Sequence, residues 1–112
     1  MECLFCKIAA GEIPSSKLFE DDRLIAFYDI DPQAPLHFLV VPKLHVTSAA
    51  DLTEQDGELL AHVFATIAKL CREQGAENGY RVVTNVGEDG GQSVAHLHFH
   101  VLAKRSLAWP PG

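Results

Sequence analysis

His96-Leu97-His98-Phe99-His100-Val101-Leu102 is a strictly alternating segment that holds three of the chain's six histidines. Successive side chains of an extended strand point to opposite faces, so the alternation predicts a strand with all three imidazoles on one face. Strand rise then separates the Cα atoms of His96 and His100 by about 13 Å, which disfavours one metal ion bound by all three. Because an unperturbed imidazole titrates at about pH 6.5, this face is predicted to carry nucleophilic, acid–base or ligand chemistry.

A glycine-rich loop, residues 86–93, comes directly before this segment. Glycines let backbone N–H groups approach a ligand and form an anion-binding concavity, although such a loop can also be a plain flexible hairpin. Next to aligned imidazoles the phosphate cradle is the favoured interpretation. A neutral imidazole can attack phosphorus, and His98, with a histidine on each side, is the predicted nucleophile. Ser93 is placed to hand a proton to the leaving group.

The composition limits the class of protein. At 112 residues the chain is predicted to form one domain, residues 1–112. The net charge of −6 argues against partners such as nucleic acid or an anionic membrane, which favour basic surfaces. The chain has no secretory signal, no run of about 20 apolar residues and an odd number of cysteines, three, so we expect a cytoplasmic protein in a reducing compartment.

The remaining chain predicts an α+β fold with a mainly antiparallel sheet. Apolar residues at helical spacing, after the N-cap Thr53 and before Gly75, predict a long helix over residues 54–74. Cys71 lies on its apolar side and is expected to be inert packing, whereas His62 is expected at the surface. A short helix is predicted over residues 4–10, and strands over 17–20, 24–28, 38–41 and 79–85.

Two further groups bear on chemistry. His37 precedes the apolar run 38–41 and can reach the face of the histidine strand, although a lone histidine there is more often structural. Cys3 and Cys6 have the spacing of half a zinc site, with His45 and His96 as candidates for the other two ligands. A redox pair or two packing cysteines are the alternatives, and the surrounding βαβ pattern of a redox motif is missing.

The sequence resembles the histidine triad (HIT) family, whose defining motif alternates three histidines with apolar residues in the same way. The resemblance covers nearly the whole chain and favours the Hint branch over the branch that cleaves dinucleoside polyphosphates. It rests on the motif and on these further segments: Phe5-Cys6-Lys7-Ile8, Glu12-Ile13-Pro14, Asp29-Ile30, Pro32-Gln33-Ala34-Pro35, His37-Phe38-Leu39-Val40, Pro42-Lys43-x-His45, Gly90-Gly91-Gln92-Ser93-Val94 and Trp109-Pro110-Pro111-Gly112.

The resemblance implies a purine nucleoside phosphoramidase that cleaves the P–N bond of adenosine 5′-phosphoramidates through a covalent nucleotidyl-histidine. It also implies a five-stranded antiparallel sheet with one long and one short helix, two chains of which pair into a ten-stranded sheet. His98 matches the nucleophile, His96 and His100 the flanking triad members, His37 a supporting histidine, and Ser93 the residue near the leaving group. The implied nucleotide-binding residues are Phe27, Asp29, Ile30, Asn85, Gly91, Gln92, Ser93, His98 and His100.

No cofactor is implied for catalysis. A structural zinc held by Cys3, Cys6, His45 and His96 is implied, which would make His96 both a triad member and a ligand. Where the family commonly ends the motif strand with Gly-Gly-Arg, this chain has Ala103-Lys104-Arg105, a departure beside the pocket.

Two rival functions stay open at this point. One is a hydrolase that uses a catalytic zinc on two of the strand histidines. The other is a nucleotide-binding or protein-interaction module with little catalysis. Within the family, a dinucleoside polyphosphate hydrolase is the remaining alternative.

Overall fold

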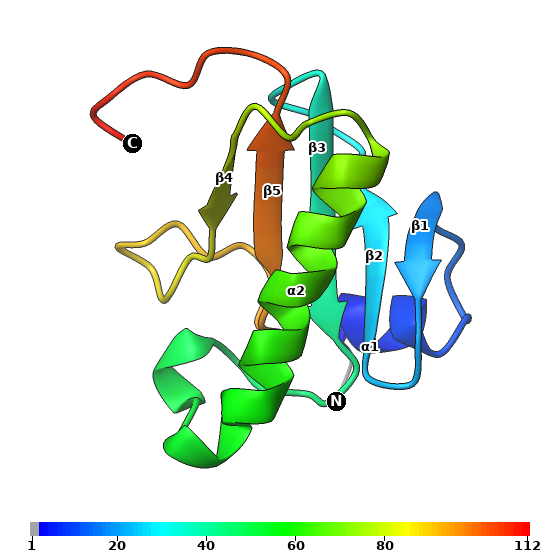
Figure 1. Cartoon of the computed structure of the whole chain (residues 1–112). Helices are drawn as coiled ribbons and strands as arrows, with labels where there is room; N and C mark the ends of the chain where they lie inside the picture. Colours follow the sequence, from blue (N-terminus) through cyan, green and yellow to red (C-terminus); the bar gives the residue numbers. More distant parts are fainter. Residues whose placement is uncertain (1–2) are drawn as a thin grey trace.

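The computed structural model describes residues 3–112, which fold around a five-stranded antiparallel sheet in the order β1-β2-β3-β5-β4 (Figure 1). The strands are β1 (Lys17–Glu20), β2 (Leu24–Tyr28), β3 (Leu36–Pro42), β4 (Tyr80–Val83) and β5 (Phe99–Ala103). Together with one long and one short helix, this sheet confirms the predicted fold class. Pairing of two chains into a ten-stranded sheet stays a prediction.

Helix α2 (Gly57–Glu73) lies across one face of the sheet (Figure 1). Its buried side chains include Val63, Ile67 and Leu70, which join the sheet residues of the larger apolar core. Cys71 is buried in the same core, as expected for a packing residue. Burying each large apolar side chain contributes about 1.5–3 kcal/mol before entropy costs, so α2 holds this face of the sheet.

The predicted start of the long helix, residue 54, is wrong by three residues. Glu54–Asp56 form a 3-10 turn, η2, and the α-helix begins at Gly57. The cause is a capping box: Thr53 Oγ1 accepts from the backbone of Gln55, and Asp56 Oδ2 accepts from the backbone of Thr53. A second 3-10 turn, η1 (Ala49–Asp51), precedes it.

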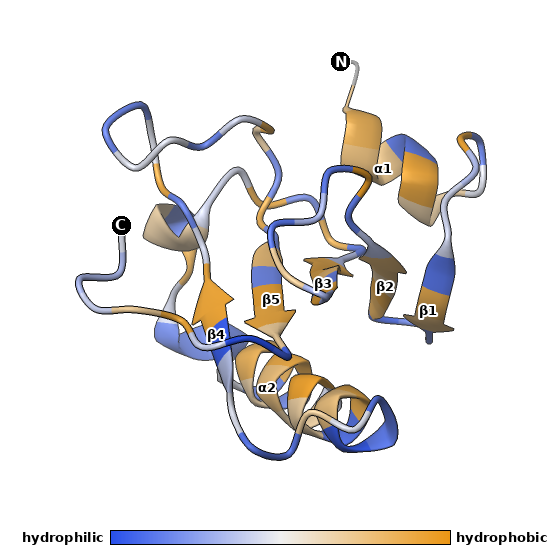
Figure 2. Ribbon diagram, turned by 90° about the horizontal axis from the view of Figure 1, so that it is seen from above, coloured by the Kyte–Doolittle hydropathy of each residue, from blue (hydrophilic) through white to orange (hydrophobic). Residues whose placement is uncertain are grey.

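Helix α1 (Leu4–Ala9) covers the opposite face, so the sheet is sandwiched between the two helices (Figure 2). Its N-cap is Cys3, whose sulfur accepts from the backbone of Cys6, and Gly11 follows its end at φ +80°. Phe5 and Ile8 of α1 pack on Phe27 and Leu39 of the sheet in a second, smaller core.

The histidine segment is only partly a strand. β5 begins at Phe99, so the prediction of a strand through residues 96–98 is wrong. The ladder ends there because the backbone N–H of Leu97 donates to the carbonyl of Val46, in the loop after β3. The alternation nevertheless survives: Leu97 and Phe99 lie in the α2-side core, while the histidines lie on the α1 side.

Two other elements complete the description. β4 is shorter than the predicted strand 79–85, because its pairing with β5 ends at Val83 and His100. Within residues 3–112, no helix is both long enough and apolar enough to cross a membrane.

Candidate functional site

His98 lies directly before β5 and is buried, with 3% of its surface exposed. Its Nδ1 is 2.7 Å from the carbonyl oxygen of His96. Since a carbonyl can only accept, Nδ1 must carry the hydrogen, and the lone pair of the neutral ring is on Nε2. The edge of Phe5 meets the ring at 4.9 Å between centroids, which fixes its orientation.

A chain of hydrogen bonds fixes the protons of two further histidines. The backbone N–H of Gln33 donates to Nδ1 of His37 at 3.0 Å, so the hydrogen of His37 is on Nε2. That Nε2 is 2.9 Å from Nδ1 of His100, which must therefore accept. His100 is left with an N–H at Nε2, and its ring lies 5.1 Å from the ring of His98. A ring with a free lone pair, His98, and a ring with a free N–H, His100, thus lie next to each other.

Asp29 faces both members of this relay. Its Oδ2 is 3.4 Å from Nε2 of His37 and 3.8 Å from Nδ1 of His100. Burial lowers the pKa of His37, and the negative charge of Asp29 opposes this. Burial, followed by the neighbouring His98 and His37, also lowers the pKa of His100. Both rings are therefore neutral at pH 7, as the hydrogen-bond relay requires.

Asp29, His37 and His100 are also close enough together to hold an ion. The relay argues against one. Because Gln33 already donates to Nδ1 of His37, a metal on Nε2 would require a ring with no hydrogen on either nitrogen. We therefore assign these residues to hydrogen bonding.

The predicted phosphate loop is built around Gln92. Its side-chain amide donates to the carbonyls of Thr47 and Val94, and its oxygen accepts from the backbone of Gly87. Gly91 and Ser93 are exposed on this loop, Gly91 with φ +78°. A Cβ on Gly90 would lie 2.4 Å from the carbonyl oxygen of Val86, so no larger residue fits there without moving the loop.

The other predicted nucleotide-binding residues lie around the same face. Asn85 is half-buried two residues beyond Val83, whose register partner is His100, so it runs alongside the His98 segment. Phe27 is buried in β2 with its ring 5.8 Å from that of Phe5. Ile30 is fully exposed, at 101% of its reference surface.

Cys3, Cys6, His45 and His96 form a compact cluster in which the candidate ligand atoms all lie within 4.8 Å of one another. Nδ1 of His96 is 3.3 Å from the sulfur of Cys3 and 3.1 Å from Nδ1 of His45. Nδ1 of His45 is 3.2 Å from the sulfur of Cys6. Tetrahedral zinc places such atoms about 3.3–3.8 Å apart, so the spacing fits.

The protons in this cluster also fit a metal. Nε2 of His96 is 2.8 Å from the carbonyl of Pro42 and must donate, which turns the lone pair of Nδ1 toward the sulfurs. Burial lowers the pKa of His96, which keeps the ring neutral. Burial and the adjacent Cys3 raise the pKa of Cys6, a thiol that a divalent cation would deprotonate. Nε2 of His45 is buried without a partner among the described residues, so only one of the two histidines has a second hydrogen bond that orients it as a ligand.

Sequence reasoning missed three contributors. Phe5 and Gln33 were noted only as parts of matching segments, and Thr84, whose hydroxyl donates to the carbonyl of His98 at 2.9 Å, was not considered. Gln33 acts through its backbone N–H, so the identity of its side chain gives no signal of this role. Thr84 does carry a signal, since it lies at the end of a strand predicted beside the histidines.

The chain is similar to known proteins in both sequence and fold. The sequence profile of the HIT domain matches residues 10–107. A HIT family hydrolase from Legionella pneumophila is 50% identical, with a TM-score of 0.97 over 99% of this chain and 100% of that one. A 14 kDa zinc-binding protein of Zea mays is 43% identical over 97% of this chain and 87% of its own length.

A more distant structure is that of a histidine triad nucleotide-binding protein from Candida albicans. It is 33% identical, with a TM-score of 0.85 over 97% of this chain and 83% of its own. The relatives therefore match nearly the whole chain.

Proposed function

Because this chain belongs to the HIT domain family, we propose that it is a nucleoside phosphoramidase that hydrolyses the P–N bond of purine nucleoside 5′-phosphoramidates. The hydrolase description of the Legionella relative supports the reaction class, and the nucleotide-binding description of the Candida protein supports the ligand class. The P–N bond and the adenosine group come from the resemblance to the Hint branch.

The observation that carries the proposal is the proton arrangement at His98. Its Nδ1–H is held by the carbonyl of His96, which leaves the Nε2 lone pair free to attack phosphorus. In the first step the Nε2–P bond forms and the P–N bond to the amine breaks. The ring of His100 lies 5.1 Å from that of His98, and its Nε2–H is proposed to donate to a phosphoryl oxygen, which stabilises charge in the transition state.

The second step returns the enzyme to its starting state. Water attacks phosphorus, the Nε2–P bond breaks, and AMP leaves while His98 recovers its lone pair. In the first step the hydroxyl of Ser93 donates a proton to the departing amine. In the second step the attacking water returns a proton to Ser93. The overall reaction consumes one water and yields AMP and an amine.

The nucleotide is proposed to lie against the loop and the relay. Gly91, Gln92 and Ser93 contact the phosphate, with Asn85 on its other side. Asp29 and Ile30 contact the ribose and base, and Phe27 lines the base pocket. Asp29 supports this assignment because its carboxylate faces His37 and His100, so a ribose held there places the phosphorus near His98.

Cys3, Cys6, His45 and His96 are proposed to hold a structural zinc. When bound, the zinc would crosslink α1 to the histidine segment, with His96 as the shared residue. The Zea mays relative supports this, as do two imidazole nitrogens that face each other at 3.1 Å with no hydrogen available from His96. Catalysis is proposed to need no cofactor, because attack is assigned to a nitrogen.

We also propose a homodimer in which β4, an edge strand, pairs with its counterpart in a second chain. β4 lies at one end of the strand order, and Tyr80 on it is 41% exposed. An unpaired edge strand offers free backbone groups, which a second copy can satisfy.

Replacing His98 by Asn tests the reaction. Release of amine from an adenosine 5′-phosphoramidate should fall by about 10³-fold or more, while circular dichroism stays unchanged. Wild-type turnover in the folded variant would overturn the assignment of the nucleophile. Faster cleavage of a dinucleoside polyphosphate than of the phosphoramidate would move the protein to the other branch, and AMP binding without turnover would mark a binding module.

A further inference from the structure

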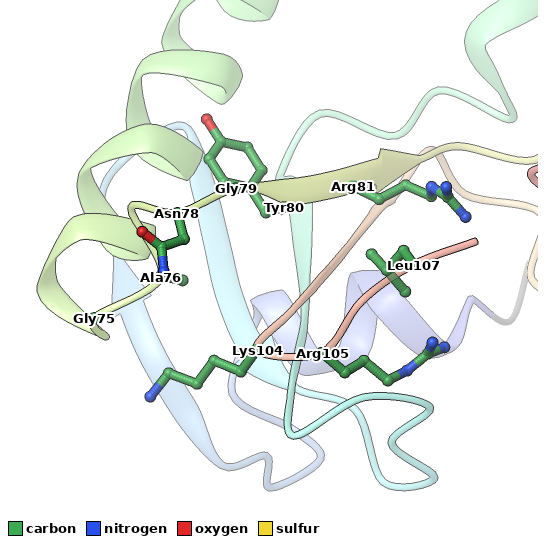
Figure 3. A pocket seen from close by; sticks show the side chains of 9 residues that line it. All are labelled: Gly75, Ala76, Asn78, Gly79, Tyr80, Arg81, Lys104, Arg105 and Leu107. Atoms are coloured by element: carbon green, nitrogen blue, oxygen red, sulfur yellow. The ribbon is translucent and has the colours of Figure 1, made fainter. Parts of the chain in front are cut away.

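A surface pocket of about 640 Å³ lies at the far end of β5 from His98, and three basic side chains line it (Figure 3). They are Arg81 on β4, and Lys104 and Arg105 in the segment that follows β5. In a chain of net charge −6 such a cluster needs an explanation. The two arginines make different hydrogen bonds, and only those of Arg105 lead to the histidines of the candidate site.

Arg105 is bound to the turn that sets the proton of His37. Its Nε donates to the carbonyl oxygen of Gln33 at 3.0 Å, and its Nη1 donates to the carbonyl of Ser106 at 3.1 Å. Gln33 in turn donates its backbone N–H to Nδ1 of His37. Arg105 is exposed, and among residues 3–112 its side chain is hydrogen-bonded only to the carbonyls of Gln33 and Ser106, so it reaches the site through this turn.

The path from Arg105 to the reacting group therefore has three hydrogen bonds. They run from Arg105 to the Gln33 carbonyl, from the Gln33 N–H to His37, and from His37 to Nδ1 of His100, at 3.0, 3.0 and 2.9 Å. The first bond holds the turn at Gln33 in place, and the other two decide which ring nitrogen of His37 and of His100 carries the hydrogen. If the Gln33 N–H turns away, Nδ1 of His37 can take the hydrogen and His37 no longer donates to His100.

We propose that Arg105 is a positioning residue for His100: by anchoring the turn at Gln33 it holds His37 and His100 in the tautomers that leave Nε2–H of His100 facing the phosphate. The effect of Arg105 on catalysis rests on the proposed function. The tautomers themselves are a property of the free protein. Arg105 touches neither substrate nor reacting atoms.

The neighbouring cations supply a contrast. Arg81 lines the same pocket, but its Nη2 donates to the carbonyl of Ala108, away from Gln33. Lys104 has a left-handed backbone, φ 70°, and no hydrogen bond in the part of the chain that the structure describes. Removing Arg81 takes away the same charge without loosening the turn, so it is a matched control.

The test compares Arg105→Ala, Arg105→Lys and Arg81→Ala by ¹⁵N NMR of the histidine rings in the free protein. In the wild type and in Arg81→Ala, His37 and His100 should each show one tautomer, protonated at Nε2. Arg105→Ala should show mixed tautomers at both rings, and Arg105→Lys should restore part of the wild-type pattern. Unchanged tautomers in folded Arg105→Ala would overturn the proposal, as would the same mixing in Arg81→Ala.

Turnover of an adenosine phosphoramidate adds a second readout. Loss of one oriented donor should lower kcat of Arg105→Ala by about tenfold and leave KM nearly unchanged. A selective rise in KM would overturn the assignment to His100 and indicate a substrate contact. If the wild type proves inactive but the tautomers mix as expected, the proposed function fails while the positioning by Arg105 stands.

Discussion

His96 and His98 are two residues apart, on the same side of the sheet, and both are buried, yet their rings have opposite environments. His98 gives its Nδ1–H to a backbone carbonyl and keeps a lone pair on Nε2, and its ring lies next to that of His100. His96 gives its Nε2–H to a backbone carbonyl and turns the lone pair of Nδ1 toward two cysteines and a histidine. The choice of which ring nitrogen carries the hydrogen therefore separates the proposed nucleophile from the proposed ligand.

The comparison defines two regions with different roles. The reaction region contains His98, His100 and His37, and the metal region contains His45 and His96 with the two cysteines. Changes in the reaction region should alter turnover with little effect on stability. Changes in the metal region should lower stability with little effect on turnover.

Replacing His100 by Phe is the change to the reaction region with the largest expected effect. It removes the donor aimed at the phosphoryl oxygen, so kcat should fall by about 10²–10³-fold in an amine-release assay. The melting temperature and the zinc content per chain, measured by mass spectrometry, should stay close to wild type. A large loss of zinc would show that the two regions are not separate.

Replacing Cys3 and Cys6 together by Ser should act on the other region. Loss of the crosslink is expected to cost about 3 kcal/mol, which corresponds to a drop of about 10 °C or more in the melting temperature of a chain of this size. Zinc content should fall to background. A chelator should reproduce the stability loss, whereas loss of turnover without loss of stability would identify a catalytic metal instead.

Phe5→Leu tests the contact that joins the regions, because the ring of Phe5 lies on α1 and meets both His96 and His98. Loss of the edge-to-face contacts should cost about 0.5–1.5 kcal/mol in urea unfolding. We expect kcat to fall only a few-fold, since the Nδ1 bond of His98 remains. Wild-type stability in this variant would show that Phe5 does not couple the two regions.

Asp21→Asn is the smallest change and serves as a probe outside both regions. Burial opposes ionisation of Asp21, but the backbone amides of Arg23 and Leu24 and the ring of His62 prevail and lower its pKa. The carboxylate therefore stabilises the fold above its unfolded pKa, and this contribution is lost as pH falls through the lower folded pKa. The free energy of unfolding, measured by urea denaturation, should be about 0.5–1 kcal/mol higher for the wild type than for Asp21→Asn at pH 7, and this difference should vanish in acid.

Much of the fold was predictable because its signals are local. The spacing of the apolar residues of α2 and the Thr53 cap required no knowledge of distant contacts, and the alternation at residues 96–102 correctly separated core from site. The extent of the histidine strand was not predictable, because it depends on a hydrogen bond from Leu97 to Val46 in another loop.

The candidate site divides in the same way. His98 follows from its place in the motif. The roles of Gln33 and Pro42 depend on backbone groups that any residue type supplies, and the side chain of Arg105 acts by donating to the backbone carbonyl of Gln33. The metal cluster joins positions 3, 6, 45 and 96, so only the Cys3 and Cys6 spacing was visible as a pattern. His45 and His96 could be named only as candidates for the other two ligands, and the resemblance then implied the full set.

The carbonyl that orients His98 belongs to the main chain of His96, and every amino acid carries one. The proposed nucleophile therefore places no demand on the side chain at position 96. The imidazole there contacts the two cysteines and His45, the carbonyl of Pro42 and the ring of Phe5. A protein designer can treat the two functions of this position as independent: an apolar repacking of positions 3, 6, 45 and 96 that keeps the backbone path should yield an enzyme that works in metal-free medium.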